Sequence, residues 1–300
     1  MSHLRQPAAP LGLRVGGFMA LAFHAAAVRL RLRLVAPDRP GYGGSTPQHG
    51  RTVAAHVQDL AHLMGTLKIP RFGVLGSSAG TMYALALTLD PVTRPMVAGR
   101  VTLLPPWIPP ASLAPGIRAP WSLRLLSLVP AAVTGLLIGF TNGLVAKKLA
   151  GDGVRVADIM TRSKPHEVSA FLEDPANDVY YRALISEWRR PGAPAGTADE
   201  MLLCAGAAGA TRGLGFSYIE HVEAPVRVFA GVEDSLVNIE HVRAWAAAAG
   251  GPGRVEVVEA EGGTHDGVVH THKAAALAAL AGDLRSAAGG AEGREGGGAG

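Results

Sequence analysis

The sequence predicts an α/β protein in which helices flank a mostly parallel central sheet and a helical cap is inserted into the chain. Short apolar runs alternate with helix-compatible stretches in the first third of the chain, which is the order of a parallel sheet. A tight Gly-x-Ser-x-Gly turn over Gly76–Gly80 joins one such run to the helix that follows. The alternation stops from Ala111 to about Val222, where helices and loops are expected, and it returns at Ala224.

The composition supports a globular chain with a sizeable core. Of the 300 residues, 48% are hydrophobic and 17% are charged. The net charge of +4 is modest for this length, so no nucleic-acid partner is expected. The single cysteine, Cys204, excludes an internal disulfide framework and fits a reducing compartment, so we expect a cytoplasmic protein. Cys204 itself lies in an apolar run and is interpreted as a small buried hydrophobic residue.

The start of the chain carries arginines and no acid. Asp38 is the first acidic residue, and arginines alternate with leucines over Arg29–Leu34. An Arg-bearing, acid-free start is also typical of an organelle transit peptide, which is the alternative to a cytoplasmic location. The alternation over Arg29–Leu34 predicts a strand with one exposed face. This conflicts with a central parallel strand, because such strands are normally covered on both faces.

Alternating elements account for the rest of the predicted core. Thr52 can cap a helix whose apolar residues from Val53 to Leu67 fall at helical spacing. With a strand end near Leu34 and an apolar run at Phe72–Leu75, this helix makes one β-α-β unit. The other expected elements are strands over Arg100–Leu104, Ala224–Ala230 and Arg254–Glu259, helices over Ala79–Leu89 and Ile239–Ala249, and a last helix ending near Ser286.

We therefore expect an α/β core formed by residues 1–111 and 223–286, a helical cap formed by residues 112–222, and a disordered Gly/Ala-rich tail at residues 287–300. Within the cap, Leu125–Ala146 contains no charged residue and has a glycine at every fourth position from 135 to 143. That length and spacing are typical of a membrane helix. Pro130 and Asn142 interrupt the stretch, which favours an apolar cap helix over a pocket. A peripheral membrane contact through the cap is compatible with either interpretation.

The Gly76–Gly80 turn is the strongest sign of chemistry. A serine on so tight a turn has a strained backbone, so its neighbours at −2 and +2 must be small, and Gly76 and Gly80 meet that need. The geometry leaves the Ser78 hydroxyl exposed above the sheet, at the positive end of the following helix. The backbone N–H of Ala79 then points to where an oxyanion would form. Ser78 is therefore a candidate nucleophile, and Ala79 is a candidate oxyanion donor.

Two further polar residues, Asp234 and His265, each follow a predicted strand. Asp234 could instead cap the next helix, and Glu233 lies beside it. His265 belongs to a polar cluster that could suggest a metal site and that also includes Asp266, His270 and His272. No glutamate or cysteine completes a recognised ligand spacing there, so neither a metal nor a cofactor is expected.

The order Ser78, Asp234, His265, each at the end of a predicted strand, resembles the α/β-hydrolase superfamily. The resemblance spans Leu34 to Leu284 and includes the loop that runs up to Ser45. It implies the α/β-hydrolase fold with an inserted cap. It also implies that Ser78 is the nucleophile, that His265 is the general base and acid, and that Asp234 orients His265. The loop before Ser45 is interpreted as structural, because its glycines and prolines form turns and it holds no base.

The chain departs from the superfamily at its front. Members usually have two additional strands and then a strand ending in His-Gly, whose loop supplies the second oxyanion donor. Here the only nearby His-Gly is His49-Gly50, which lies too far along the chain. Gly16-Gly17, after a possible strand over Leu11–Val15, could replace it, with the N–H of Phe18 as donor. The alternative is a truncated front that leaves a gap in the sheet, which the arginine-bearing strand would fit.

The predicted function is that of an esterase-like serine hydrolase, which cleaves a small hydrophobic ester through an acyl-enzyme intermediate. The apolar cap favours a hydrophobic acyl or alcohol group, because the cap and not the triad determines the substrate. The alternative is a catalytically weak or inactive α/β-hydrolase-like binding protein, in which the altered front leaves a pocket without turnover. The complete set of Ser78, Asp234 and His265 favours the enzyme, since a pure binder does not need these residues together.

Overall fold

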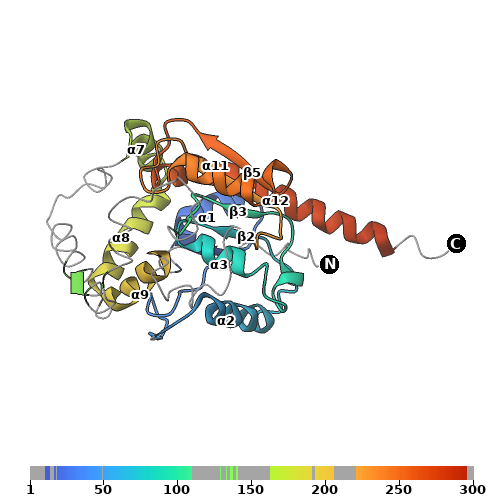
Figure 1. Cartoon of the computed structure of the whole chain (residues 1–300), viewed down its shortest axis with the longest axis horizontal. Coiled ribbons are helices and arrows are strands. Elements are labelled where there is room, and N and C mark those ends of the chain that lie inside the picture. The colour runs from blue at the N-terminus through green and yellow to red at the C-terminus, as the bar shows by residue number, and fades with distance from the viewer. Residues whose placement is uncertain are drawn as a thin grey trace.

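A parallel sheet of five strands forms the centre of the part of the protein that the structure describes (Figure 1). The structure is a computed structural model and describes residues 11–13, 17, 19–48, 50–109, 129, 133, 136, 137, 140, 163–190, 193–205 and 221–295. Neighbouring strands are all parallel, which confirms the predicted fold class. In sheet order the strands are β1 (Leu11–Leu13), β2 (Val74–Gly76), β3 (Val101–Leu103), β4 (Val226–Gly231) and β5 (Val255–Ala260).

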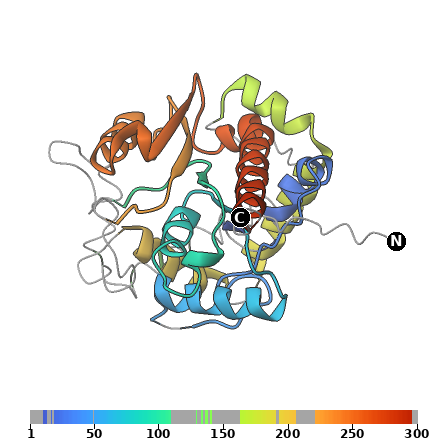
Figure 2. The same cartoon turned by 90° about the vertical axis from the view of Figure 1, so that its right-hand side faces the viewer.

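Helices cover both faces of this sheet and divide the buried apolar residues into two cores. Successive strand residues point to opposite faces, so Val74 belongs to the first core and Leu75 to the second. In Figure 2, α1 and α12 lie next to each other, in agreement with their contacts. The helices of the first core include α2 (Val53–Thr66), α3 (Gly80–Ala86) and α11 (Ile239–Ala248), and those of the second include α1 (Met19–Arg29) and α12 (Gly267–Glu295).

Most of the predicted core elements are confirmed, with ends that differ by a few residues. α2 shows why: the Thr52 side chain accepts a hydrogen bond from the backbone N–H of Ala55 at 3.0 Å and so caps the helix. Its buried residues Val53, Val57, Leu60 and Met64 follow the helical period. Two short 3-10 helices complete the core, η1 (Arg94–Met96) and η3 (Gly251–Gly253).

The strand predicted over Arg29–Leu34 is wrong. α1 runs to Arg29, the chain turns at Leu30 and Arg31, and only Val35 beyond them makes a β-bridge. The buried residues Met19, Ala22, Phe23, Ala26 and Ala27 carry a helical period into this stretch, and that longer signal outweighs six alternating residues. The arginines are exposed, and Arg29 in the last helical turn complements the helix dipole. Among the described residues near Leu34, a single β-bridge at Val35 thus stands in place of the first strand of the predicted β-α-β unit.

The front of the chain supplies a strand instead of a gap. β1 pairs in parallel with β2 along its whole length, with Leu11 opposite Val74 and Leu13 opposite Gly76. β1 lies within the strand predicted over Leu11–Val15, whose last two residues are outside the described part. The alternative of a gap in the sheet beside the serine-bearing strand is wrong, because β1 occupies that position.

The C-terminal residues continue a helix where a disordered tail was predicted. α12 extends to Glu295, and its last turns project beyond the rest of the molecule in Figure 1. Alanine, glutamate and arginine dominate the non-glycine residues of this stretch, and their high helix propensity prolongs a helix that the core has already nucleated. Residues 296–300 lie outside the described part.

The described residues between β3 and β4 are largely helical. They include α7 (Pro165–Leu172), α8 (Pro175–Arg189) and α9 (Ala193–Ala205). The boundaries of the predicted cap at 112 and 222 stay a prediction, and most of Leu125–Ala146 falls outside the described residues. Among the helices that the structure describes, none combines the length and apolarity needed to cross a membrane.

Candidate active site

The turn between β2 and α3 holds Ser78 in a strained conformation. Ser78 has a φ of 50°, in the left-handed region, which costs a non-glycine residue about 1–2 kcal/mol. Its backbone N–H donates to the carbonyl of Pro105 at 2.8 Å, which fastens the turn to the end of β3. A Cβ at Gly76 would lie 2.9 Å from both the Cβ of Ala84 and the carbonyl oxygen of Gly80. The tightness predicted for this turn is therefore present.

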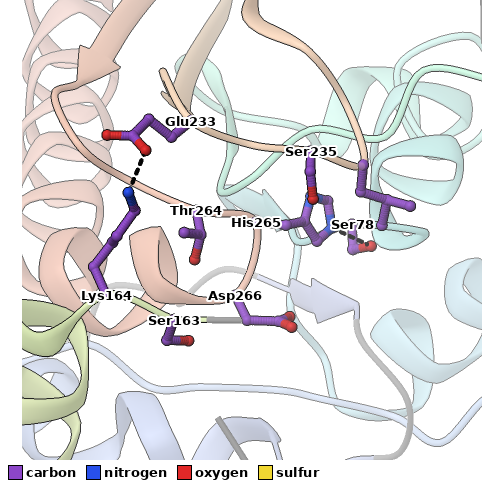
Figure 3. A pocket seen from close by; sticks show the side chains of 9 residues that line it. Ser78, Ser163, Lys164, Glu233, Ser235, Thr264, His265 and Asp266 are labelled. Carbon is purple, nitrogen blue, oxygen red and sulfur yellow. Dashed lines mark hydrogen bonds and ion pairs between the residues drawn. The ribbon is translucent and has the colours of Figure 1, made fainter. Parts of the chain in front are cut away.

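Ser78, His265 and Asp234 form one chain of hydrogen bonds. Ser78 Oγ lies 2.9 Å from His265 Nε2 (Figure 3). On the other side of the ring, His265 Nδ1 lies 2.6 Å from Asp234 Oδ2. The three residues follow β2, β5 and β4, so the carboxyl ends of parallel strands bring them to one edge of the sheet. The structure thus brings together the three residues singled out in the sequence, with the histidine between the hydroxyl and the carboxylate.

Asp234 does not cap the helix that follows it, which was its alternative role. Asn238 caps α11 by accepting a hydrogen bond from the backbone N–H of Glu240 at 2.8 Å. Asp234 is buried, and its second oxygen accepts from the backbone N–H groups of Leu236 at 2.8 Å and Val237 at 2.9 Å. These bonds hold the carboxylate in place while Oδ2 faces the imidazole.

The other histidines of the last helix lie apart from this chain of bonds. The ring of His270 packs edge-on against Phe171, with 4.8 Å between ring centres. His272 lies near Phe229 and Thr271, and burial lowers the pKa of its imidazole. Within the described ranges, no three histidine, cysteine, aspartate or glutamate side chains are grouped so that they could hold a metal ion.

One of the two predicted oxyanion donors can be placed. Ala79 is the residue before the first turn of α3, and its backbone N–H donates to no other residue that the structure describes. Gly17 is different, because its N–H donates to the side chain of Asp38, which also accepts from the N–H of Gly44 at 3.2 Å. The N–H of Gly17 is therefore committed to the loop before Ser45. Phe18 lies outside the described residues, so its role as second donor stays a prediction.

A cavity of about 510 Å³ opens over Ser78 and His265 (Figure 3). Most of the described residues that line it are polar or charged, and two of them, Lys164 and Glu233, form an ion pair. Leu236 is the one apolar side chain among the described lining residues, and the segment expected to make the pocket hydrophobic is largely outside them. The other residues along the wall are Ser163, Ser235, Thr264 and Asp266.

A buried charged cluster beside α3 was not foreseen from the sequence. Glu200 of α9 forms ion pairs with Arg39 and with Arg51, the latter at 2.6 Å, and accepts from the hydroxyl of Tyr83 at 3.0 Å. Burial and the two arginines lower the pKa of His56 to about 3. Arg39 and Arg51 lie so far from Glu200 in the chain that no local pattern signals their pairing.

The surroundings of Cys204 agree with its interpretation as an unreactive residue. Its side chain is partly buried, and it is not bonded to another cysteine. Desolvation, with a further contribution from the Glu200 carboxylate, raises the pKa of its thiol well above the usual value. A thiol in this environment stays protonated at neutral pH and makes a poor nucleophile.

The fold and the site define an α/β protein with a strained serine between a strand and a helix, next to a histidine and a carboxylate. A family model described as "Alpha/beta hydrolase family" matches residues 12–280, and the chain belongs to this family. No curated protein matches the chain.

Solved structures share the fold at low sequence identity. An esterase from Thermogutta terrifontis is 18% identical with a TM-score of 0.60, and the match covers 94% of this chain and 90% of that one. An enol-lactonase from Burkholderia xenovorans LB400 is 18% identical with a TM-score of 0.59, covering 95% and 94%. A haloalkane dehalogenase variant from Bradyrhizobium elkanii is 16% identical with a TM-score of 0.60, covering 98% and 93%. At this identity they establish the fold and leave the reaction open.

Proposed function

We propose that the protein is a serine hydrolase that cleaves a small carboxylic ester through an acyl-enzyme intermediate. The observation that carries this proposal is the continuous chain from Ser78 Oγ through the His265 ring to Asp234, with contacts of 2.9 and 2.6 Å. A serine hydroxyl is too weak an acid to attack a carbonyl by itself, so a base within hydrogen-bond distance is the first requirement of this chemistry. His265 Nε2 meets that requirement.

The proposed reaction has two halves. His265 Nε2 takes the proton of Ser78 Oγ as this oxygen attacks the ester carbonyl carbon, and the N–H of Ala79 donates to the oxyanion that forms. Asp234 keeps a proton on Nδ1 and stabilises the imidazolium. The imidazolium then gives its proton to the leaving alcohol, and the acyl group stays on Ser78. A water molecule, deprotonated by His265, releases the acid and restores the serine.

The type of nucleophile favours acyl transfer over dehalogenation, although a dehalogenase shares the fold. Displacement of a halide by a serine oxygen would form an ether, which water does not cleave under these conditions. A carboxylate nucleophile would form an ester that can be hydrolysed, but position 78 holds a serine. Esters and lactones are therefore the substrate classes that suit Ser78.

The acyl and alcohol groups are the less determined part of the proposal. An apolar cap predicts a small hydrophobic ester, whereas the described cavity wall adds hydrogen-bonding groups such as Ser163 and Ser235. We expect turnover of short aryl esters, with the preference for chain length reporting how apolar the completed pocket is. A series of p-nitrophenyl esters from acetate to octanoate measures this preference directly.

A fluorophosphonate probe tests the proposal, because it reacts only with an activated serine. We expect the wild-type protein to be labelled and Ser78→Ala to lose labelling completely. Ser77→Ala is the matched control, since Ser77 is buried and does not line the cavity. Labelling that survives in Ser78→Ala would overturn the assignment, and an unlabelled wild type without esterase activity would favour the binding protein.

A further inference from the structure

We infer that Glu167, in the first turn of α7, is a positioning residue that holds the backbone next to His265. This role rests on the proposed function, since it concerns the placement of the general base. α7 belongs to the predicted cap, whereas His265 belongs to the core loop between β5 and α12. One carboxylate thus links the predicted cap to the core loop that carries His265.

The contacts of Glu167 are those of an acceptor-only group. Glu167 is 0% exposed, and one oxygen accepts from the backbone N–H of Thr264 at 2.6 Å. The other oxygen accepts from the Thr264 hydroxyl at 2.8 Å and from the backbone N–H of Lys164 at 2.8 Å. No cation of the described residues forms an ion pair with this carboxylate. A buried charge is costly unless it is hydrogen-bonded, so three donors are what keeps it here.

Thr264 is bound both by Glu167 and by the first residues of α12, and His265 is the next residue in the chain. The hydroxyl of Thr264 accepts from the backbone N–H of Gly267 at 3.2 Å, and its carbonyl accepts from the N–H of Val268 at 3.1 Å. Glu167 binds the N–H and the hydroxyl of the same residue. Since His265 must satisfy contacts of 2.9 and 2.6 Å at once, a shift of its backbone would break at least one of them.

The same turn of α7 also reaches the loop that carries the acid. Lys164, at the N-cap position of α7, forms an ion pair with Glu233 (Figure 3). Glu233 directly precedes Asp234 in the chain. The Glu167 side chain accepts from the backbone N–H of Lys164, as the N3 residue of a capping box does, and so holds the first turn of α7. The start of α7 thus contacts both loops of the site, with the buried contact on the histidine side.

The glycine after Asp266 leaves the space that Glu167 occupies. A Cβ built on Gly267 would overlap the carboxylate of Glu167. By contrast, a Cβ on Gly282, farther along the same helix, would meet no described atom within 4 Å. A glycine-to-alanine substitution should therefore displace the Glu167 side chain at position 267 and leave it in place at position 282.

Glu167→Gln is the first test. The amide keeps the size of the side chain but turns one acceptor into a donor that faces other donors. We expect the rate of fluorophosphonate labelling and kcat on p-nitrophenyl acetate to fall about 10- to 100-fold, with KM changed less than about threefold. Thr264→Val removes the hydroxyl and its bonds to Glu167 and Gly267 but keeps the N–H contact to Glu167, so it should lose less.

Lys273→Met is the matched control. Lys273 of α12 is another buried tie to a helix of the predicted cap, and it binds Asp174 and Asn177. Its loss should lower Tm without slowing labelling, because neither partner belongs to the histidine loop. A role of Glu167 in stability alone would make the two variants behave alike, with labelling at the wild-type rate in both.

Gly267→Ala and Gly282→Ala provide the second test, which keeps Glu167 itself intact. Gly267→Ala should reproduce the slow labelling of Glu167→Gln, and Gly282→Ala should label like wild type. Wild-type labelling rates in folded Glu167→Gln or Gly267→Ala would overturn the positioning role. An unlabelled wild type would instead reject the proposed function, and the role of Glu167 with it.

Discussion

At the scale of single residues, the site requires that Ser78 keeps its unusual backbone conformation and that His265 keeps two contacts at once. The left-handed φ of Ser78 is stabilised by the hydrogen bond from its N–H to Pro105 and by the absence of a side chain at Gly76. His265 needs its two contacts together, and Asp234 supplies one of them from a rigid turn. Function at this scale depends on side chains that are held firmly enough to keep these distances.

Substitution can distinguish His265 from the histidines of the last helix. His265→Ala should remove nearly all hydrolysis, because no other base lies within reach of Ser78 Oγ among the residues described. Asp234→Ala should cost less than His265→Ala, since a misoriented imidazole keeps some activity. Initial rates on p-nitrophenyl acetate measure these losses.

His270→Ala and His272→Ala serve as controls for the base. Both rings pack against aromatic side chains away from the serine, so each variant should keep most of the activity. If either substitution proved as damaging as His265→Ala at equal stability, the base would have to be reassigned.

His56 makes stability depend on pH. Its pKa is about 3 in the folded protein, because burial and then Arg39 and Arg51 disfavour the imidazolium, whereas the ordinary value is 6.5. Above pH 6.5 both states are neutral at this residue. As the pH falls from 6.5 towards 3, the unfolded chain binds a proton and the folded protein does not, so stability falls by up to about 1.4 kcal/mol per pH unit.

His56→Leu should therefore flatten this part of the pH profile of stability, measured by urea unfolding at several pH values between 7 and 4. His24→Gln is the control, because His24 is exposed on α1. A slope in His56→Leu that equals the wild-type slope would contradict the assignment of the effect to this buried ring.

At the scale of whole elements, α9 is fastened to the core by one carboxylate between two guanidinium groups. Glu200 is buried, as are Arg39 and Arg51, and the guanidinium of Arg39 also lies 5.2 Å from the ring centre of Tyr83 on α3. Such a cluster specifies where α9 sits. It is costly to disrupt, since the charges that remain have no water to solvate them.

Glu200→Gln should accordingly destabilise the protein by about 3–5 kcal/mol, because it leaves two buried cations without their counter-charge. Urea unfolding at pH 7 measures the change. Glu240→Gln breaks an ion pair with Arg243 on the surface and should change stability little. Similar losses in both variants would show that burial of the Glu200 cluster is not the source of its contribution.

For the whole molecule, the last helix serves the core over part of its length. Asp283 accepts from Arg227 of β4 at 2.8 Å, and Leu284 lies over Gly73 just before β2. The turns beyond these residues project away from the body in Figure 1. α12 therefore acts as a core element up to about Ala287 and as an extension after it.

Two C-terminal deletions distinguish these parts. Removal of residues 289–300 should leave Tm and labelling close to wild type, whereas removal of residues 283–300 should lower Tm by several degrees by exposing the sheet beneath Leu284. Thermal unfolding followed by circular dichroism gives both values. Equal Tm values for the two deletions would show that Asp283 and Leu284 do not anchor the helix.

Local patterns were sufficient for much of this protein. The elbow around Ser78, the capped helix after Thr52 and the order of serine, aspartate and histidine could all be predicted, because tight turns, helix caps and strand ends depend on neighbours in the chain. The alternation at Arg29–Leu34 led to a wrong strand prediction, because it too is a pattern of neighbouring residues only. Six residues hold too little information to outweigh a helical period that begins at Met19.

The sequence by itself therefore determined the fold class and the three residues that now meet at the edge of the sheet. The tertiary structure alone decided that β1 lies beside β2, that Glu200 forms ion pairs with two arginines, and that Glu167 contacts the residue before His265. The physical reason is distance along the chain. Propensity and periodicity act between near neighbours, whereas Glu167 and Thr264 are brought together only when the sheet and its helices have packed, and no local pattern encodes such a pair.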